Sequence, residues 1–282
     1  MNQEISSAKQ AFNIKGRVAL ITGGAGLLGI KHAEAIAEAG GIPILLDIDG
    51  ESSKESAKII TETFNMECHG LCVDITNPDS ISEALETVLS KFGRVDILIN
   101  NAANNPKVEG SILTKSHWSR LENFPLDVWN KDVEVGLTGA FLCSKIVGCE
   151  LARRGKGVIL NISSDLGIIA PDQRIYKKEG LPDDMQPVKP ITYSVIKHGL
   201  IGLTKYLATY WADKGVRVNA LCPGGVYNNQ PDEFVKKLTN LIPMGRMADK
   251  DEYKGTVLFM ISDASLYMTG SAIVVDGGRS CW

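Results

Sequence analysis

A strand-like apolar run that leads into closely spaced glycines constrains this chain more than any other feature. Residues 18–21 are apolar, Thr22 and Gly23 follow, and the spacing Gly24-x-Gly26-x-x-Gly29 then opens a helical pattern. Glycines let the backbone turn tightly and approach a pyrophosphate, whose charge is held by the free N–H groups and the positive dipole at the helix start. The pattern therefore predicts a dinucleotide-binding turn; a tight turn without a ligand is the alternative.

An acidic residue at the end of the next apolar run favours cofactor binding. Asp47 lies 18 residues after Gly29, close to the ~20 expected for an acid that hydrogen-bonds the adenosine ribose diol. The strand, the helix and this acid all lie where cofactor binding requires them. A carboxylate at this position would repel a 2′-phosphate, and the glycine turn holds no basic residue to offset it. We therefore predict NAD rather than NADP as the cofactor.

The length and composition predict one domain over residues 1–282. With 44% hydrophobic residues the chain can bury a substantial core, and no linker, repeat or low-complexity tract divides it. The net charge is −3 and no basic stripe interleaves with aromatics, so nucleic acid is not expected as a partner. Residues 1–12 lack an apolar signal core, and no uncharged apolar run approaches the ~20 residues of a membrane span, so we expect no membrane contact.

The cysteines and histidines predict neither a metal site nor disulfides. The six cysteines show no CxxC spacing, and the four histidines are scattered without an HExxH pair. Cys68 and Cys72 lie four residues apart in an expected strand, so they share one face and are typical of core residues. Unpaired cysteines fit a reducing compartment, and we predict a cytoplasmic location.

Short apolar runs alternate with helical patterns along the whole chain. This alternation predicts an α/β fold, a single-domain Rossmann-like doubly wound parallel sheet of about seven strands with helices on both faces. We expect strands at residues 17–21, 42–46, 67–73, 95–99, 157–162, 216–221 and 272–275. We expect helices near residues 28–39, 51–64, 79–92, 126–153, 192–213 and 249–261. Ligands bind beyond the carboxyl ends of such strands, so functional residues are expected there.

Two inserted segments interrupt the alternation, near residues 104–125 and 169–191. Loops this long are usually functional, and both leave the ligand edge of the expected sheet, so we interpret them as flaps over a substrate; solvated surface loops are the alternative. The second segment is rich in Pro, Asp and Lys, which predicts little buried apolar surface and a mobile flap. Its basic residues could meet a phosphate or form a solvated face; they are Arg174, Lys177, Lys178 and Lys189.

A tyrosine and a lysine four residues apart are the candidate catalytic pair. Tyr193 and Lys197 open an expected helix, and their spacing puts both side chains on one face. A phenol with the usual pKa of about 10 is a poor base at neutral pH, but an adjacent ammonium lowers that pKa, so Tyr193 is a candidate general base. Ser164 ends a strand at the same edge, where its hydroxyl can orient a substrate oxygen. Tyr210 and Lys214 share the spacing, but at the far end of the helix, where we expect packing only.

Six ordered features resemble the classical short-chain dehydrogenase/reductase family over nearly the whole chain. They are the glycine turn, Asp74-Ile75, Asn100-Asn101-Ala102-Ala103, Ser164, Tyr193 with Lys197, and Pro223-Gly224-Gly225-Val226. The resemblance implies that Asp74 and Ile75 flank an adenine and that Asn101 lies along the cofactor. It further implies that Lys197 holds the nicotinamide ribose and that Val226 contacts the carboxamide. The expected cofactor site therefore comprises Thr22, Gly23, Gly24, Gly26, Leu28, Gly29, Asp47, Ile48, Asp74, Ile75, Asn101, Ala102, Ala103, Tyr193, Lys197, Pro223, Gly224 and Val226.

The chain departs from the family pattern at three places. The glycine motif is usually TGxxxGxG, but position 27 is Leu, which is similar to extended members that act on nucleotide sugars; too few residues follow the catalytic tyrosine for their added domain. Gly136 stands where the family usually has a catalytic Asn, and a water could fill that space and keep a proton path to Lys197. The motif after Pro223-Gly224 lacks its usual Thr and offers Asn228.

Together these features predict an NAD(H)-dependent oxidoreductase that transfers hydride between a secondary alcohol or ketone and nicotinamide, with Ser164, Tyr193 and Lys197 as catalytic residues. The glycine turn, Gly136 and the second segment are similar to those of dehydrogenases encoded among bacterial genes for surface or flagellar sugars, which implies a sugar or phosphosugar substrate. The alternatives are a sugar epimerase or dehydratase that recycles NAD internally, and an NAD-binding sensor or scaffold with weak catalysis. The second apolar faces of the two long helices, which family members pair, predict a homodimer or homotetramer.

Overall fold

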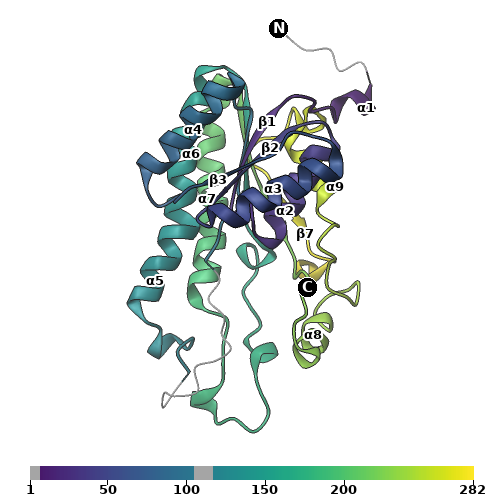
Figure 1. Ribbon diagram of the computed structural model, residues 1–282. Coiled ribbons are helices and arrows are strands. Elements are labelled where there is room, and N and C mark those ends of the chain that lie inside the picture. The colour runs from purple at the N-terminus through teal and green to yellow at the C-terminus, as the bar shows by residue number, and fades with distance from the viewer. Residues whose placement is uncertain (1–6, 105–116) are drawn as a thin grey trace.

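One seven-stranded parallel sheet forms the centre of the structure, a computed structural model that describes residues 7–104 and 117–282 (Figure 1). The strand order is β3-β2-β1-β4-β5-β6-β7. The strands are β1 (Val18–Thr22), β2 (Ile42–Asp47), β3 (His69–Cys72), β4 (Ile97–Asn100), β5 (Gly157–Ile162), β6 (Val216–Pro223) and β7 (Ala272–Val275). The order reverses between β1 and β4, and ligands bind beyond the carboxyl ends of the strands at such a switch point.

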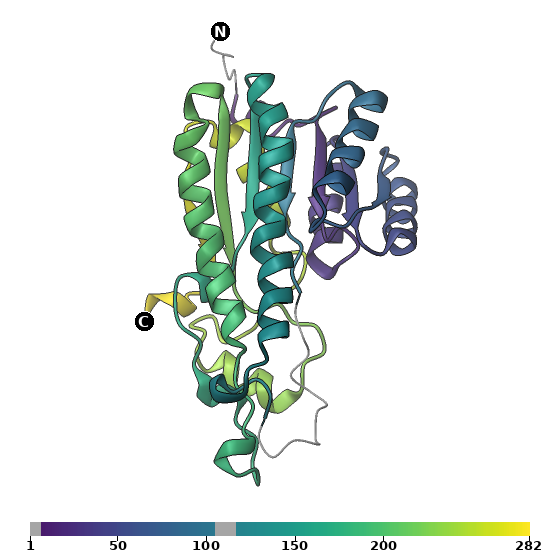
Figure 2. The ribbon, with the colours of Figure 1, turned by 90° about the vertical axis from the view of Figure 1, so that its left-hand side faces the viewer.

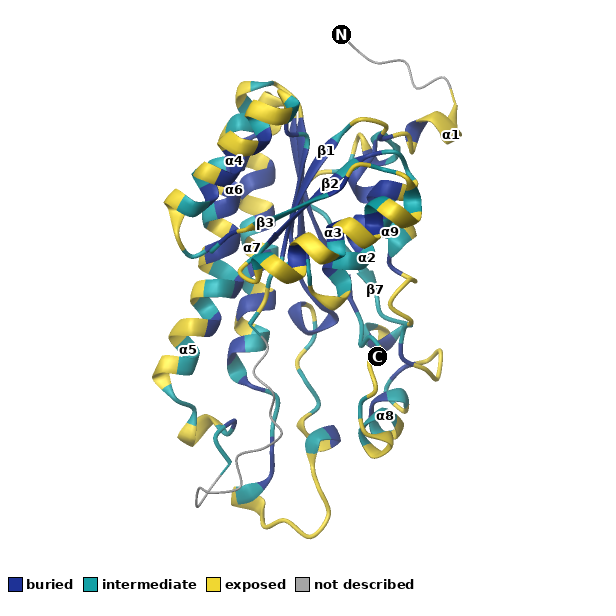
Figure 3. Ribbon diagram, viewed as in Figure 1, coloured by how far each residue is buried: buried dark blue, intermediate teal, exposed yellow. Residues whose placement is uncertain are grey.

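Helices cover both faces of this sheet, which confirms the predicted fold (Figures 1 and 2). The helices are α1 (Ala8–Ala11), α2 (Leu27–Glu38), α3 (Gly50–Phe64), α4 (Pro78–Phe92), α5 (Leu126–Val133), α6 (Gly139–Arg153), α7 (Ile191–Tyr210), α8 (Asp232–Thr239) and α9 (Lys254–Ile261). One apolar core lies under α4, α6 and α7, and the other lies under α2, α3 and α9. Strands β1, β4, β5 and β6 are buried throughout because both of their faces are covered (Figure 3).

The helix predicted at residues 126–153 contains one wide turn. Between α5 and α6 the chain makes a π-helical turn, Glu134–Thr138, in which Gly136 is buried. Such turns inside α-helices occur frequently at functional sites. By length and composition the whole run Leu126–Arg153 could cross a membrane, but 44% of its apolar window is buried. Its α6 half packs on α4, β4 and β5, and a core helix has the same length and apolar content.

Helical boundaries near the C-terminus differ from the sequence prediction. The helix expected at 249–261 begins only at Lys254, because residues 249–253 form turns in which the Glu252 carboxylate binds Arg246. Helix α8 was not predicted at all. It has only eight residues and most of them are polar, so an apolar period is hard to detect; Leu238 nevertheless buries one side of it.

The segment 169–191 buries more apolar surface than its composition predicts. In the 3₁₀ turn Gln173–Tyr176, Ile175 is buried in a small core with α8, and the Tyr176 ring lies 5.6 Å from that of Phe234. The expectation of little buried apolar surface is therefore wrong for this half. Residues 177–184, by contrast, are exposed and form the outermost loop (Figure 3).

Residues 105–116 of the other expected flap lie outside the described residues. The described end of that segment runs beside the second one. The His117 N–H donates to the Asp184 carbonyl oxygen at 3.1 Å, and the Ser119 hydroxyl accepts from the Val188 N–H at 3.0 Å. The two inserted segments therefore meet on the same side of the molecule.

Candidate active site

A cavity of about 690 Å³ follows the carboxyl edge of the sheet, a volume typical of cofactor and small-molecule sites. Most of the predicted site residues line it, and they follow strands β1 to β6. They are Gly23, Gly26, Leu28, Asp47, Ile48, Asp74, Ile75, Asn101, Ala102, Ala103, Ser164, Tyr193, Lys197, Pro223, Gly224 and Val226. The fold thus brings together residues that are far apart in the sequence.

The three remaining residues predicted for the cofactor site do not line the cavity but shape its floor. The Thr22 hydroxyl accepts from the backbone N–H groups of Asn101 and Ala102, at 3.0 and 3.1 Å, and so joins β1 to the end of β4. A Cβ on Gly24 would lie 2.7 Å from the Cα of Leu45, and one on Gly29 would overlap a backbone carbonyl. A side chain at Gly24 would therefore push the turn away from β2, and one at Gly29 would push α2 away from the turn.

One end of the cavity is defined by Asp47, at the end of β2. Its carboxylate accepts from the N–H of Ala25 at 3.0 Å, which ties the glycine turn to the second strand. Helix α2 starts directly after Gly26, whose lack of a side chain leaves the first N–H groups without a side-chain cap. Among the described residues that line the cavity, the basic side chains are Lys189, Lys197 and Arg279. They interact with Tyr193 and residues near it rather than with Asp47.

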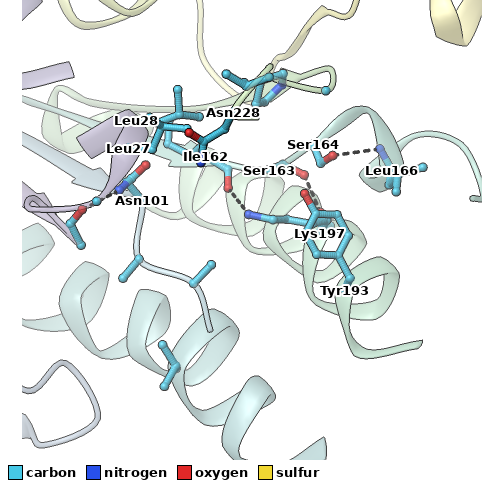
Figure 4. Close-up of a pocket in the computed structure, with 18 of the residues that line it drawn as sticks. Leu27, Leu28, Asn101, Ile162, Ser163, Ser164, Leu166, Tyr193, Lys197 and Asn228 are labelled. Atoms are coloured by element: carbon cyan, nitrogen blue, oxygen red, sulfur yellow. Dashed lines mark hydrogen bonds between the residues drawn. The ribbon is translucent and has the colours of Figure 1, made fainter. Parts of the chain in front are cut away.

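The other end holds the predicted catalytic residues Ser164, Tyr193 and Lys197 (Figure 4). The Lys197 ammonium donates to the carbonyl oxygen of Ile162 at 2.8 Å, and its Nζ lies 5.7 Å from the centroid of the Tyr193 ring. The Ser163 hydroxyl donates to the Lys197 carbonyl oxygen at 2.7 Å. These bonds fasten the first turns of α7 to the end of β5, so the three side chains meet although they come from two elements.

Burial, rather than the neighbouring lysine, dominates the acidity of the catalytic tyrosine. Burial raises the pKa of Tyr193, and a hydrogen bond with Ser164 only partly opposes it. The net direction is opposite to the lowering that the spacing of Tyr193 and Lys197 predicts, and the lysine ammonium donates to the Ile162 carbonyl oxygen. Burial, followed by the charge of Lys189, lowers the pKa of Lys197 to about 8.

Two charged features lie beside Tyr193 that the sequence does not place there. Arg279, near the C-terminus, donates to the Asp165 carboxylate at 2.7 Å, and both side chains are buried. Asp165 in turn accepts from the Ser164 hydroxyl at 2.8 Å. The ammonium of Lys189 lies 3.7 Å from the centroid of the Tyr193 ring. Asp165 follows Ser164 directly, but nothing local could reveal a partner 114 residues away.

The position of the missing asparagine is filled by an isoleucine. A Cβ on Gly136 would lie 2.8 Å from Cγ2 of Ile196, so a larger residue requires that side chain to move. A cavity of about 20 Å³ lies next to it, lined by Gly136, Asp132, Lys189 and Lys197 among others. This volume is enough for one water molecule. Asp132 is buried one helical turn before Gly136.

Asn228 and Tyr210, two further residues considered from the sequence, lie in different surroundings. Asn228 lines the main cavity beyond β6, where the family motif lacks its threonine (Figure 4). Tyr210 is 60% exposed at the far end of α7 and stacks on Tyr206, away from the cavity. In residues 7–104 and 117–282 no group of three or more His, Cys, Asp or Glu side chains could hold a metal ion.

Comparison with known proteins finds oxidoreductases that are similar to this chain over nearly its whole length. The family described as short chain dehydrogenase matches residues 17–176, and the family described as enoyl-(acyl carrier protein) reductase matches residues 184–280. An uncharacterized oxidoreductase of Thermotoga maritima is 33% identical over 95% of this chain and 99% of its own length. An NAD-dependent glycerol dehydrogenase of Listeria innocua is 31% identical over 95% of each chain.

A solved structure shows the same fold. The gluconate 5-dehydrogenase of Burkholderia cenocepacia J2315, in complex with NADP and tartrate, is 26% identical and superposes with a TM-score of 0.84. The match covers 98% of this chain and 100% of that chain. Similarity therefore extends over the whole sheet and both ends of the cavity.

Proposed function

This chain belongs to the short-chain dehydrogenase family, and from that premise we propose that it is an NAD-dependent dehydrogenase for a secondary alcohol on a polyhydroxyl substrate. The observation that carries the proposal is one continuous cavity with Asp47 at one end and Ser164, Tyr193 and Lys197 at the other. A dinucleotide needs the first end and hydride transfer to a substrate needs the second.

The residues at the Asp47 end fit a nicotinamide cofactor. The α2 N-terminus offers N–H groups without a side-chain cap to the pyrophosphate, and close packing keeps side chains out of the turn. Asp47 would hydrogen-bond the adenosine ribose and repel a 2′-phosphate. The relatives use either cofactor, since the Listeria protein is NAD-dependent and the Burkholderia structure contains NADP. The choice of NAD therefore rests on Asp47.

The proposed reaction needs one proton acceptor and one group that orients the substrate. A bound NAD supplies the hydride acceptor. Ser164 orients the substrate oxygen, Tyr193 exchanges the hydroxyl proton, and Lys197 holds the cofactor ribose. Because burial raises the pKa of Tyr193, its phenol is protonated at neutral pH and donates readily during carbonyl reduction. Alcohol oxidation requires the phenolate, so its rate rises with pH.

The small cavity beside Gly136 provides a route for that proton. It reaches both Tyr193 and Lys197, and one water fits in it. On its far side the buried Asp132 carboxylate accepts from the Thr192 hydroxyl at 2.6 Å and from Asn104 at 2.7 Å. We propose that a water between Lys197 and Asp132 replaces the path that the absent asparagine would supply.

The relatives support a polyhydroxyl substrate for a dehydrogenase. Glycerol and gluconate, named for two of them, both carry several hydroxyl groups. The alternatives of an epimerase or dehydratase and of a non-catalytic sensor find no support among these relatives, and Ser164, Tyr193 and Lys197 meet in the cavity as turnover requires.

Steady-state assays test the proposal. Purified protein should reduce NAD with at least one of glycerol, xylitol, sorbitol and gluconate, and NADP should support a far lower kcat/KM. Calorimetric titration should show tighter binding of NADH than of NADPH. Equal affinity for the two cofactors would falsify the choice of NAD, and tight NADH binding without any turnover on a broad alcohol panel would remove the dehydrogenase assignment.

The exposed faces of α6 and α7 bear on how the protein assembles. Figure 2 shows α6 and α7 side by side on one face, and their outer sides expose Phe141, Val195, Tyr206 and Tyr210. We propose that these faces pair in a homodimer or homotetramer in the cytoplasm. Light scattering at micromolar concentration should report the assembly, and Phe141→Asp should shift it toward the monomer; a native monomer would contradict the assignment.

A further inference from the structure

The substrate end of the cavity carries an excess of positive charge. Its charged side chains are Lys189, Lys197, Arg279 and Asp165, which are three cations and one anion. Two of the cations have oxygen acceptors, since Lys197 donates to the Ile162 carbonyl and Arg279 to Asp165. Buried cations without a matching anion are costly unless a ligand supplies the missing charge.

Among the described residues, Lys197 and Lys189 both lack a carboxylate partner, but only Lys189 also lacks an oxygen acceptor. In the described part of the chain no oxygen atom pairs with the Lys189 ammonium, which lies 3.7 Å from the centroid of the Tyr193 ring. Its backbone is held firmly, because the Lys189 N–H donates to Gln173 Oε1 at 2.8 Å and Pro190 follows at the start of α7. The base of the side chain is therefore anchored, and the ammonium lies at the reacting tyrosine with its charge available to a ligand.

The other basic residues of the segment do not share this position. Arg174 is 82% exposed and pairs with Asp172 through its side chain. Lys177 is 60% exposed, with its Nζ 3.9 Å from the Asp183 carboxylate. Neither residue lines the cavity, and Lys178 does not line it either. Of the four basic residues considered from the sequence, only Lys189 faces the site.

We propose that Lys189, with the Arg279–Asp165 pair beside it, forms an anion subsite, so that the substrate of this enzyme is a polyhydroxyl alcohol bearing a carboxylate or a phosphate ester. Because Lys189 lies over the ring of Tyr193, the anionic group sits next to the reacting hydroxyl rather than at the far end of a long chain. This inference rests on the proposed dehydrogenase function and adds the charge of its substrate.

The charged groups around Lys189 make anion binding depend on pH. Asp165, Arg279, Lys197 and Tyr193 face it in the main cavity, and Asp132 lies across the small one. Burial, the largest influence, lowers the pKa of Lys189 to about 8, against the opposing charge of Asp165. The ammonium is present below that pH and lost above it. Affinity for an anionic substrate is therefore expected to fall as the pH rises through about 8.

Three matched probes test the subsite, namely D-sorbitol, D-gluconate and D-sorbitol 6-phosphate, which differ mainly in charge. Lys189→Met should raise KM for the favoured anion about 10- to 100-fold, the loss expected for a charged hydrogen bond, and should raise KM for sorbitol by a clearly smaller factor. Lys189→Arg should restore much of the anion binding. Lys177→Met is the matched control, because it removes an exposed charge from the same segment. Comparison of gluconate with the phosphate ester shows whether the subsite prefers a carboxylate or a phosphate.

Binding to the NADH-bound protein gives a readout without turnover, because an alcohol cannot be oxidised by the reduced cofactor. Calorimetry should show that gluconate or sorbitol 6-phosphate binds more tightly than sorbitol, with a pH dependence that Lys189→Met removes. If Lys189→Met weakened the binding of sorbitol and of both anions by the same factor, the inference would be overturned, since Lys189 would then act only through Tyr193.

The two proposals can fail separately. If sorbitol is oxidised and neither anion binds more tightly than sorbitol, the subsite is wrong and the dehydrogenase stands. If no alcohol of the broad panel is oxidised but an anion binds through Lys189, the subsite stands and the proposed reaction is wrong.

Discussion

At the Asp47 end of the cavity the side chains come from consecutive elements, β1, α2 and β2, whereas the Tyr193 end joins residues as far apart in the sequence as Asp165 and Arg279. The glycine turn is held by backbone packing, and Asp47 reaches it through one hydrogen bond to Ala25. The Tyr193 end depends instead on buried charges, including a pair between Asp165 and Arg279. Backbone sterics fix the cofactor end, and side-chain electrostatics fix the substrate end. Substitutions should therefore have different consequences at the two ends.

The largest expected effect is at the substrate end. Tyr193→Phe removes the hydroxyl that exchanges the proton but keeps the ring under Lys189, so kcat should fall about 10²- to 10⁴-fold while NADH affinity changes little. Tyr210→Phe is the control, because Tyr210 is exposed at the other end of the same helix. Comparable losses in the two variants would mean that the wrong tyrosine has been assigned.

The second effect is on stability. Asp165→Asn leaves the Arg279 guanidinium buried without its carboxylate, which should lower the free energy of unfolding by about 3 kcal/mol. Glu233→Gln breaks an exposed pair with Lys237 and should cost less than about 1 kcal/mol. Urea denaturation measures both. A small loss in Asp165→Asn would show that Arg279 can reach solvent and that the substrate end is less rigid than its burial indicates.

The same difference between the two ends explains what could be predicted from the sequence. The strands, the glycine turn and Asp47 follow from local apolar runs and short spacings, and Tyr193 with Lys197 follows from a helical spacing of four. The Asp165–Arg279 pair depends on how β7 brings the C-terminus back to the site, and α8 is too short to show a period. Lys189 was noticed only as one of four basic residues, because its place over the Tyr193 ring depends on tertiary packing. The raised pKa of Tyr193 likewise depends on burial, which no spacing reports.

A third substitution probes the cofactor end alone. Asp47→Ala removes a hydrogen-bond acceptor for the ribose and the repulsion of a 2′-phosphate. The kcat/KM with NAD, divided by the kcat/KM with NADP, should therefore fall about 10- to 100-fold. The KM for the alcohol and the pH dependence of turnover should stay near those of the native protein, because the Tyr193 end is unchanged. A change in either would show that the two ends of the cavity are coupled.

The smallest expected effect concerns the small cavity behind Tyr193. Asp132 accepts from Thr192, next to the catalytic tyrosine, so it could act by positioning α7 or by taking part in the proton route. Asp132→Asn keeps the shape but removes the charge, and Thr192→Val removes the same hydrogen bond while leaving the carboxylate. If the carboxylate serves the proton route, Asp132→Asn should lower kcat for alcohol oxidation about 3- to 10-fold and displace its pH profile, whereas Thr192→Val should leave the profile in place. Equal losses with unchanged profiles in both variants would assign Asp132 a positioning role, and proton transfer would then have to pass from Lys197 to solvent by another path.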